Sequence, residues 1–213
     1  MNRFLGSAVI VLTFLTLLLG GQPAWATDPD SGYTDKSDLQ AHYDKAKFFY
    51  NQLSTSGNIG SDRYNWLKGA GNFRRIYLAE PKSELAPACL FMLGRLYYDV
   101  YKKFGQGIDL GEAISYYRDV NTLFPGNRLA DDALYAVGVI LLEDVSDPKR
   151  AAETFGKIIS DYPDGDMRSQ AGTRLKLLSK DFDIPLPEEM LSDTPSMKLT
   201  NVMPVKYWSS KDY

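Results

Sequence analysis

The fold is decided by three stretches of the chain that align with one another without gaps: NFRRIYLAEPKSELAPACLFMLG at residues 72–94, YYRDVNTLFPGNRLADDALYAVG at 116–138, and TFGKIISDYPDGDMRSQAGTRLK at 154–176. In each stretch an aromatic residue precedes a proline by eight positions, and a large apolar residue follows that proline by four. Such self-similarity at a period of about 40 residues predicts a stack of repeated units. The prolines are Pro81, Pro125 and Pro163, and the aromatic residues are Phe73, Tyr117 and Phe155.

Each unit is predicted to be a pair of α-helices. In the first unit, apolar residues recur at helical spacing from Tyr64 to Tyr77, and the pattern stops before Pro81. A second helical stripe runs from Leu85 to Val100. The same reading gives seven helices and no strand between residues 38 and 181. We therefore expect an all-α repeat domain over 38–181.

Three helix starts are expected from capping chemistry. Ser83 is suited to cap the second helix of the first unit, and Asp109 is suited to cap the next helix in a capping-box arrangement with Glu112. Asp147 precedes Pro148, a combination typical of an N-cap followed by proline in the first helical turn.

Small residues recur where two antiparallel helices of a unit would meet. With no side chain or only a methyl group, such residues allow close approach of the two helices. The aromatic residues would then fill the other end of each helix pair. The small residues are Gly94, Ala113, Gly138 and Ala151.

The N-terminus has the features of a secretory signal peptide. Arg3 precedes an apolar run at residues 4–19, and a small-residue exit follows at Ala24-Trp25-Ala26. Cleavage there gives a signal peptide at 1–26 and a linker at 27–37. The alternative is an uncleaved membrane anchor, which the intervening glycines and proline disfavour. We expect an exported, periplasmic or envelope protein with no membrane insertion after cleavage.

Composition argues against several classes of partner and chemistry. The chain has a net charge of −3, which is not the footprint of a nucleic-acid-binding protein. Cys89 is the single cysteine, so no intramolecular disulfide forms, and its apolar surroundings predict a small core residue. His42 is the single histidine, so the sequence supplies no catalytic triad and no zinc site.

Two acidic motifs are predicted to serve helix starts and turns and not to bind a cation. The Asp164-Gly165-Asp166 motif lacks the further ligands of a calcium loop, so we interpret it as a turn and helix cap. Asp131 and Asp132 lie early in a predicted helix, where acidic side chains interact favourably with the helix dipole. No cofactor is expected in this chain.

The composition changes after residue 181. Residues 182–201 contain several prolines and acidic residues without a helical stripe, which is typical of an extended linker. Residues 202–213, VMPVKYWSSKDY, have the bulky alternation of an opening β-strand. A lone strand cannot pair its backbone groups, so we expect it to begin a further domain. The alternative is a natural tail.

The repeat resembles the tetratricopeptide repeat. Its pattern of leucine-glycine, aromatic, alanine, aromatic and proline is matched twice, although the first hairpin is lengthened and Leu141 replaces an aromatic residue in the second unit. The resemblance implies a short α-solenoid of about seven helices, with the signal peptide before it and an extended tail after it. The matching residues are Leu93, Gly94, Tyr97, Ala113, Tyr117 and Pro125, then Val137, Gly138, Ala151, Phe155 and Pro163.

The order of segments resembles the N-terminal part of exported N-acetylmuramoyl-L-alanine amidases. In those peptidoglycan hydrolases, tetratricopeptide-like repeats and a linker precede a β-rich AMIN domain, whose first strand is similar to Lys206–Tyr213 here. The resemblance implies that this chain is a non-catalytic targeting piece, truncated at the start of its AMIN domain, and that zinc belongs to the missing amidase domain. The alternative is a stand-alone periplasmic scaffold or envelope-assembly adaptor.

The same resemblance implies where a protein or peptide partner in the cell envelope would bind. Tetratricopeptide arrays use a concave face formed by the first helix of each pair. The alternative is that several of these side chains pack between repeats instead. The residues at the corresponding positions are Phe91, Arg95, Tyr98, Asp132, Tyr135 and Leu142.

Overall fold

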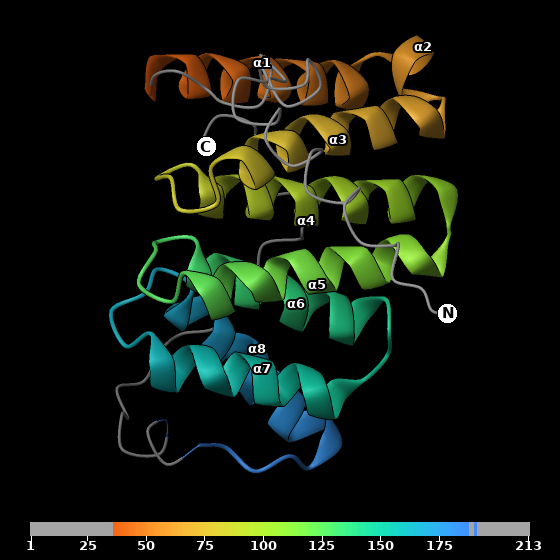
Figure 1. Cartoon of the computed structure of the whole chain (residues 1–213). Coiled ribbons are helices and arrows are strands. Elements are labelled where there is room, and N and C mark those ends of the chain that lie inside the picture. The colour runs from red at the N-terminus through yellow and green to blue at the C-terminus, as the bar shows by residue number, and fades with distance from the viewer. Residues whose placement is uncertain (1–35, 188–189, 191–213) are drawn as a thin grey trace, which may run out of the picture. The chain divides into compact units, whose positions relative to one another are not determined.

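The computed structural model describes residues 36–187 and 190, and every regular element in that part is an α-helix. The predicted all-α class is therefore confirmed there. The expected signal peptide at 1–26 and the expected strand at 202–213 lie outside the described residues. The helices are α1 (Lys36–Thr55), α2 (Gly57–Gly60), α3 (Arg63–Ala79), α4 (Ala86–Phe104), α5 (Gly107–Leu123), α6 (Ala130–Glu143), α7 (Pro148–Asp161) and α8 (Arg168–Phe182) (Figure 1).

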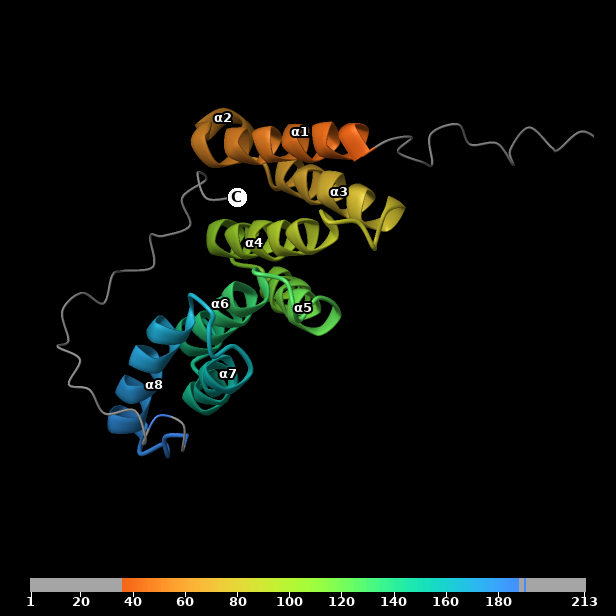
Figure 2. The same cartoon turned by 90° about the vertical axis from the view of Figure 1, so that its left-hand side faces the viewer.

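The helices pack mainly against their neighbours in chain order. α3 contacts α1 and α4 (Figure 1). Further along the chain, α4 contacts α5, α5 contacts α6, α6 contacts α7, and α7 contacts α8. In Figure 2, α4, α6 and α8 lie on one side of this stack, whereas α3, α5 and α7 lie on the other. α4 and α6 are each covered by helices on both sides, and they carry the longest sets of buried residues.

The three prolines of the repeat follow helix ends with one backbone geometry. Glu80 (φ −136°, ψ 69°), Phe124 (φ −134°, ψ 55°) and Tyr162 (φ −127°, ψ 64°) are the C-caps of α3, α5 and α7. Each directly precedes its proline, which disfavours the α conformation because the proline ring crowds the preceding residue. The residues before the next helices also share one conformation: Leu85, Leu129 and Met167 are all in the right-handed helical region.

Glycine allows close helix approach at two equivalent places. A Cβ atom added to Gly94 would lie 2.8 Å from the ring of Tyr117, and one added to Gly138 would lie 2.5 Å from the ring of Phe155. Both rings are buried. The close approach expected at these two glycines is therefore confirmed by the packing of α4 on α5 and of α6 on α7. The expectation that the aromatic residues fill the other end of each pair is wrong, because the rings of Tyr117 and Phe155 lie directly against the glycines.

Two of the three expected N-caps are wrong. α4 begins after Leu85 instead of Ser83, because backbone hydrogen bonds from Ser83 N to Glu80 O and from Ala86 N to Ser83 O form the turn. α5 begins after Gln106, so Asp109 lies inside its first turn, buried and paired with Arg63. The first error arises from the backbone turn before α4, and the second from the tertiary contact of Asp109 with Arg63. Rules for helix capping consider neither.

The third expected cap is confirmed. The Asp147 side chain accepts a hydrogen bond of 3.0 Å from the backbone N–H of Arg150, and Pro148 begins α7.

One helical turn was not predicted. Gly57–Gly60 forms α2, in addition to the seven helices expected between residues 38 and 181. The carbonyl oxygen of Gly60 accepts a hydrogen bond of 2.8 Å from the indole Nε1 of Trp66, which ties the turn to α3. A side chain at Gly60 would collide with the carbonyl oxygen of Leu53. α2 therefore depends on a close approach to the end of α1.

The first part of the expected linker lies against the helices. A Cβ atom at Gly156 on α7 would be 3.6 Å from Pro187, and one at Gly172 on α8 would be 3.6 Å from Met190. α8 itself ends at Phe182, one residue beyond the predicted boundary of the domain. The repeat domain therefore includes a short covering segment after its last helix.

Candidate functional site

A groove of about 720 Å³ opens where the C-terminal end of α1 meets the start of α3 and the C-terminal half of α4. This volume falls within the range of about 300–1,000 Å³ that is usual for ligand pockets. It is lined by Tyr50, Asn51, Leu53, Ser54, Thr55, Trp66, Arg95, Asp99, Lys102 and Lys103.

Buried aromatic residues form the base of the groove. Tyr50 and Trp66 are both 4% exposed, and their rings meet edge to face at 6.4 Å between centroids. The Tyr50 hydroxyl donates a hydrogen bond of 2.6 Å to Oδ2 of Asp99. Burial raises the pKa of Asp99, although this hydrogen bond and the nearby Arg95 act in the opposite direction. The base is thus a rigid aromatic platform with one carboxyl group.

Two cations lie over the rings of this platform, and a third lies over the neighbouring Tyr98. The guanidinium carbon of Arg95 lies 5.3 Å from the Tyr50 ring centroid, and Lys103 Nζ lies 5.9 Å from that of Trp66. Lys102 Nζ is 5.6 Å from the Tyr98 ring centroid and 3.0 Å from Oδ1 of Asp144. Carboxylates lie beside two of these cations, since Asp144 pairs with Lys102 and Asp99 interacts with Arg95.

The first group of predicted partner-binding residues is divided by the structure. Arg95 lines the groove, as described above. Tyr98 is half-buried beside the groove and donates a hydrogen bond of 2.9 Å to Oδ2 of Asp144. Phe91 is 1% exposed, and its ring packs edge to face against Tyr117 at 5.3 Å. Phe91 therefore packs between α4 and α5.

The second group, on α6, does not line the groove. Asp132 is buried, and Tyr135 is half-buried with its ring 5.5 Å from that of Phe155. Leu142 is half-buried near the end of α6. The described structure thus brings one of the six predicted residues, Arg95, into the groove.

Sequence reasoning missed the residues that complete the groove. Tyr50 belongs to the apolar stripe of α1, so its pattern predicts only burial. Trp66 belongs in the same way to the apolar stripe of α3, so its pattern also predicts only burial. The adjacent Lys102 and Lys103 are typical of a helix C-terminus, where positive charges interact favourably with the helix dipole. These four residues converge only after α1, α3 and α4 pack together.

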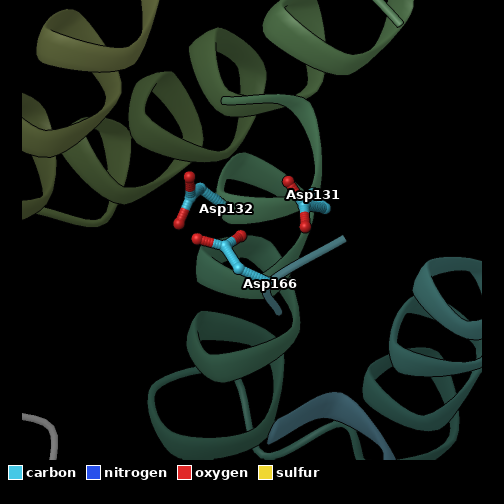
Figure 3. A group of neighbouring side chains, drawn as sticks. All are labelled: Asp131, Asp132 and Asp166. Carbon is cyan, nitrogen blue, oxygen red and sulfur yellow. The ribbon is translucent and has the colours of Figure 1, made fainter. Parts of the chain in front are cut away.

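Three carboxylates form a second cluster, where the connection to α8 meets α6 (Figure 3). Ligand oxygens of Asp131, Asp132 and Asp166 lie within 4.8 Å of one another, which is the type of oxygen donor that hard cations take. Asp131 also accepts a hydrogen bond of 3.2 Å from the backbone N–H of Met167, at the N-cap of α8. The turn expected at Asp164-Gly165-Asp166 is therefore present, with a backbone hydrogen bond from Gly165 N to Tyr162 O, but the expected cap is wrong, because α8 begins after Met167 and no side chain caps it.

The carboxylates of this cluster lie close enough to repel one another. Burial, and then the adjacent Asp131 carboxylate, raise the pKa of Asp166 above its ordinary value.

The zinc chemistry of the amidases does not fit the residues described here. His42 lies exposed on α1, where its Nδ1 is 2.8 Å from the Asp38 carbonyl oxygen. Cys89 is fully buried, and burial raises the pKa of its thiol to about 12, which opposes formation of a thiolate ligand. Neither residue belongs to the acidic cluster, so within residues 36–187 and 190 no histidine or cysteine set is assembled for zinc.

None of the described helices is both long and apolar enough to span a membrane. In comparisons with known proteins, no protein-family model matches this chain, and no curated protein matches it closely enough to count as a relative.

Proposed function

We propose that this chain is a non-catalytic protein-binding module, the tetratricopeptide-like head of an exported peptidoglycan N-acetylmuramoyl-L-alanine amidase. Its role would be to position a hydrolase domain in the cell envelope through a protein or peptide partner. The zinc and the catalytic groups would belong to that later domain.

The observation that carries the helical-repeat part of the proposal is the recurrence of one connection. The C-caps Glu80, Phe124 and Tyr162 share a backbone conformation, and each is followed by proline and a new helix. The Gly94–Tyr117 and Gly138–Phe155 contacts recur in two units and join residues that match the tetratricopeptide pattern. Recurrent units of this kind are usually binding scaffolds.

The residue inventory supports binding over catalysis. The sequence contains one histidine and one cysteine, which leaves no base and nucleophile that could orient one another. The groove beside α4 instead offers fixed aromatic rings and positive charges, which are features of a recognition surface.

The amidase part of the proposal rests on the order of segments along the sequence. An apolar N-terminal run with an Ala-Trp-Ala exit precedes the repeats, and a proline-rich acidic stretch leads to Lys206–Tyr213. This order supports export to the periplasm and continuation into an AMIN-like domain.

The test is to read the genomic DNA downstream of the Tyr213 codon. We expect an open reading frame that continues into β-strand patterns and then into a histidine and glutamate zinc set. A stop codon directly after Tyr213 would contradict the amidase assignment and favour a stand-alone periplasmic scaffold. Fractionation of cells expressing the protein should in addition recover it from the periplasm.

A further inference from the structure

Gly172 on α8 stands at a position that holds a buried leucine in the other two repeat units. In the three aligned stretches it corresponds to Leu90 on α4 and Leu134 on α6, which are 1% and 5% exposed. A Cβ atom at Gly172 would lie 3.6 Å from Cε of Met190 and 3.7 Å from Cδ1 of Ile159. The tip of the Met190 side chain therefore covers the position at which the other units carry their own leucine.

Gly156 on α7 shows the same relation. It corresponds to Arg74 on α3 and Arg118 on α5. Among the described residues, the atom that a Cβ at Gly156 would meet within 4 Å is Cγ of Pro187, at 3.6 Å. A glycine inside a helix is destabilising relative to alanine, so a feature outside the helix is needed to explain it. The covering segment after α8 (residues 183–190) supplies that feature at both glycines, through Pro187 and Met190.

The covering segment takes the place of a further helix. Gly94 and Gly138 admit the aromatic rings of α5 and α7, but the corresponding residue of α8 is Lys176, which is exposed. A further helix could not pack on α8 as α5 packs on α4, because lysine has a Cβ atom where the inner units have none. Residues 183–187 have no regular secondary structure. The array is thus followed by a peptide-like segment on its last two helices.

Charge complementarity favours this segment as the occupant of the α7–α8 surface. α8 has four basic side chains and one acidic side chain, whereas residues 183–190, DIPLPEEM, contain three acidic residues and no basic one. Arg174 is paired with Glu143 at 3.3 Å, but Lys176 and Lys180 are exposed on α8. Opposite charges on a surface and its ligand favour their association.

We propose that the α7–α8 surface is a peptide-binding site that this chain fills with its own residues 183–190, with Pro187 over Gly156 and Met190 over Gly172. The site recognises an acidic segment in which a methionine follows a proline by three positions. The covering segment is a strap that can leave the site and open it to the same sequence on another molecule. This inference goes beyond the proposed function and does not depend on it.

The experiment is fluorescence anisotropy with the purified full chain and a labelled peptide of residues 183–190. In the unchanged chain the tethered segment competes at a high effective concentration, so the peptide should bind weakly. A Pro187→Ser, Met190→Ser double variant weakens the tethered segment, and the peptide should bind it at least about tenfold more tightly. The matched control is Pro185→Ser, at an exposed position of the same segment, which should leave peptide affinity as in the unchanged chain.

A second variant fills the site from α8. Gly172→Leu, added to the double variant, restores the residue of the other units in the space that Met190 covers, so peptide affinity should fall at least about tenfold. Gly111→Leu adds the same side chain at an exposed position of α5 and should leave the affinity of the double variant unchanged. Circular dichroism checks that each variant is folded.

Failure of the peptide to bind the double variant would overturn the inference, and would leave the covering segment as a packing element only. Equal affinity of the peptide for the double variant and the unchanged chain would show that the tethered segment does not occupy the site. A dimer of the unchanged chain that the double variant converts to a monomer would assign the site to the segment of a second copy, and would overturn occupancy within one chain. None of these results bears on the reading frame downstream of Tyr213, so the proposed function fails or stands separately.

Discussion

At the scale of single residues, the two helix pairs depend on positions where no side chain can be accommodated. Gly138 faces the ring of Phe155, which is 0% exposed and also contacts Tyr135. Because the ring is enclosed on its other sides, it cannot move away from an added methyl group. The glycine is therefore a packing requirement of the repeat.

Gly138→Ala should lower the free energy of unfolding by about 1–3 kcal/mol, because the new Cβ overpacks the contact with Phe155. The matched control is Gly111→Ala, at an exposed position of α5 where an added Cβ meets nothing within 4 Å. That control should stabilise the protein by up to about 1 kcal/mol, because alanine is the better helix former. Urea denaturation of both variants would measure the difference, and a neutral Gly138→Ala would contradict the packing argument.

An ion pair between a half-buried arginine and a buried aspartate is the second residue-scale requirement. Arg63 lies 2.6 Å from Oδ1 of Asp109, which is 2% exposed, and thereby joins the start of α3 to the first turn of α5. Arg63→Ala would leave that carboxylate buried without its cation, which should cost about 3–5 kcal/mol.

The control for this variant is Lys36→Ala, which breaks the exposed Lys36–Glu84 pair of 2.7 Å. Its unfolding midpoint should remain almost unchanged, because water screens exposed pairs. Thermal melting of both variants would test the contrast, and equal shifts would show that burial of Asp109 is not what gives the pair its importance.

At the scale of elements, the helices of this protein start in two different ways. α7 starts with a side-chain cap, since Asp147 accepts from the N–H of Arg150. α4, α6 and α8 start instead from a compact turn after the proline, in which backbone groups bond to one another. The turn after each proline therefore replaces the capping side chain.

Asp147→Ala should destabilise the protein by about 1 kcal/mol through loss of the cap on α7. Ser83→Ala should be neutral or slightly stabilising, although Ser83 is the residue that capping rules select, because its hydroxyl oxygen is buried without a hydrogen-bond partner in the described structure. Chemical denaturation separates the two outcomes. A larger loss for Ser83→Ala than for Asp147→Ala would restore the capping prediction for α4.

At the scale of the whole molecule, the described helices form an array in which contacts run from one helix to the next. α3, α4, α5, α6 and α7 each have helices packed on both sides, and α4 and α6 bury the most residues, whereas α1 lies at one end of the array and α8 at the other (Figure 1). In such arrays stability is approximately the sum of the units and the interfaces between neighbours. The end helices therefore lack one stabilising interface each.

Amide hydrogen exchange should consequently be slowest in α4 and α6 and faster in α1 and α8. The segment around Pro187 and Met190 covers part of α7 and α8, so we expect Met190→Ala to accelerate exchange in α8 without changing α1. Mass spectrometry of exchanged fragments would measure both effects. Uniform exchange across all helices would indicate one cooperative unit and contradict this prediction.

The sequence by itself determined the repeat, the helical class, the positions of the three prolines and the roles of Gly94 and Gly138. These features depend on local chemistry: the period of apolar residues, the restriction that proline places on the residue before it, and the absence of a side chain. For the same reason the Asp147 cap was predictable, since its hydrogen-bond partner lies three residues away.

The tertiary structure alone decided the groove and the ion pair. Tyr50, Trp66, Arg95 and Lys103 lie on three helices, and their patterns predict burial or helix-end charge but not convergence. Asp109 has the local pattern of an N-cap, but its partner Arg63 lies on α3, 46 residues earlier in the chain. A local pattern reports which face of a helix is buried, whereas the neighbours of that face are set by how all the helices pack together.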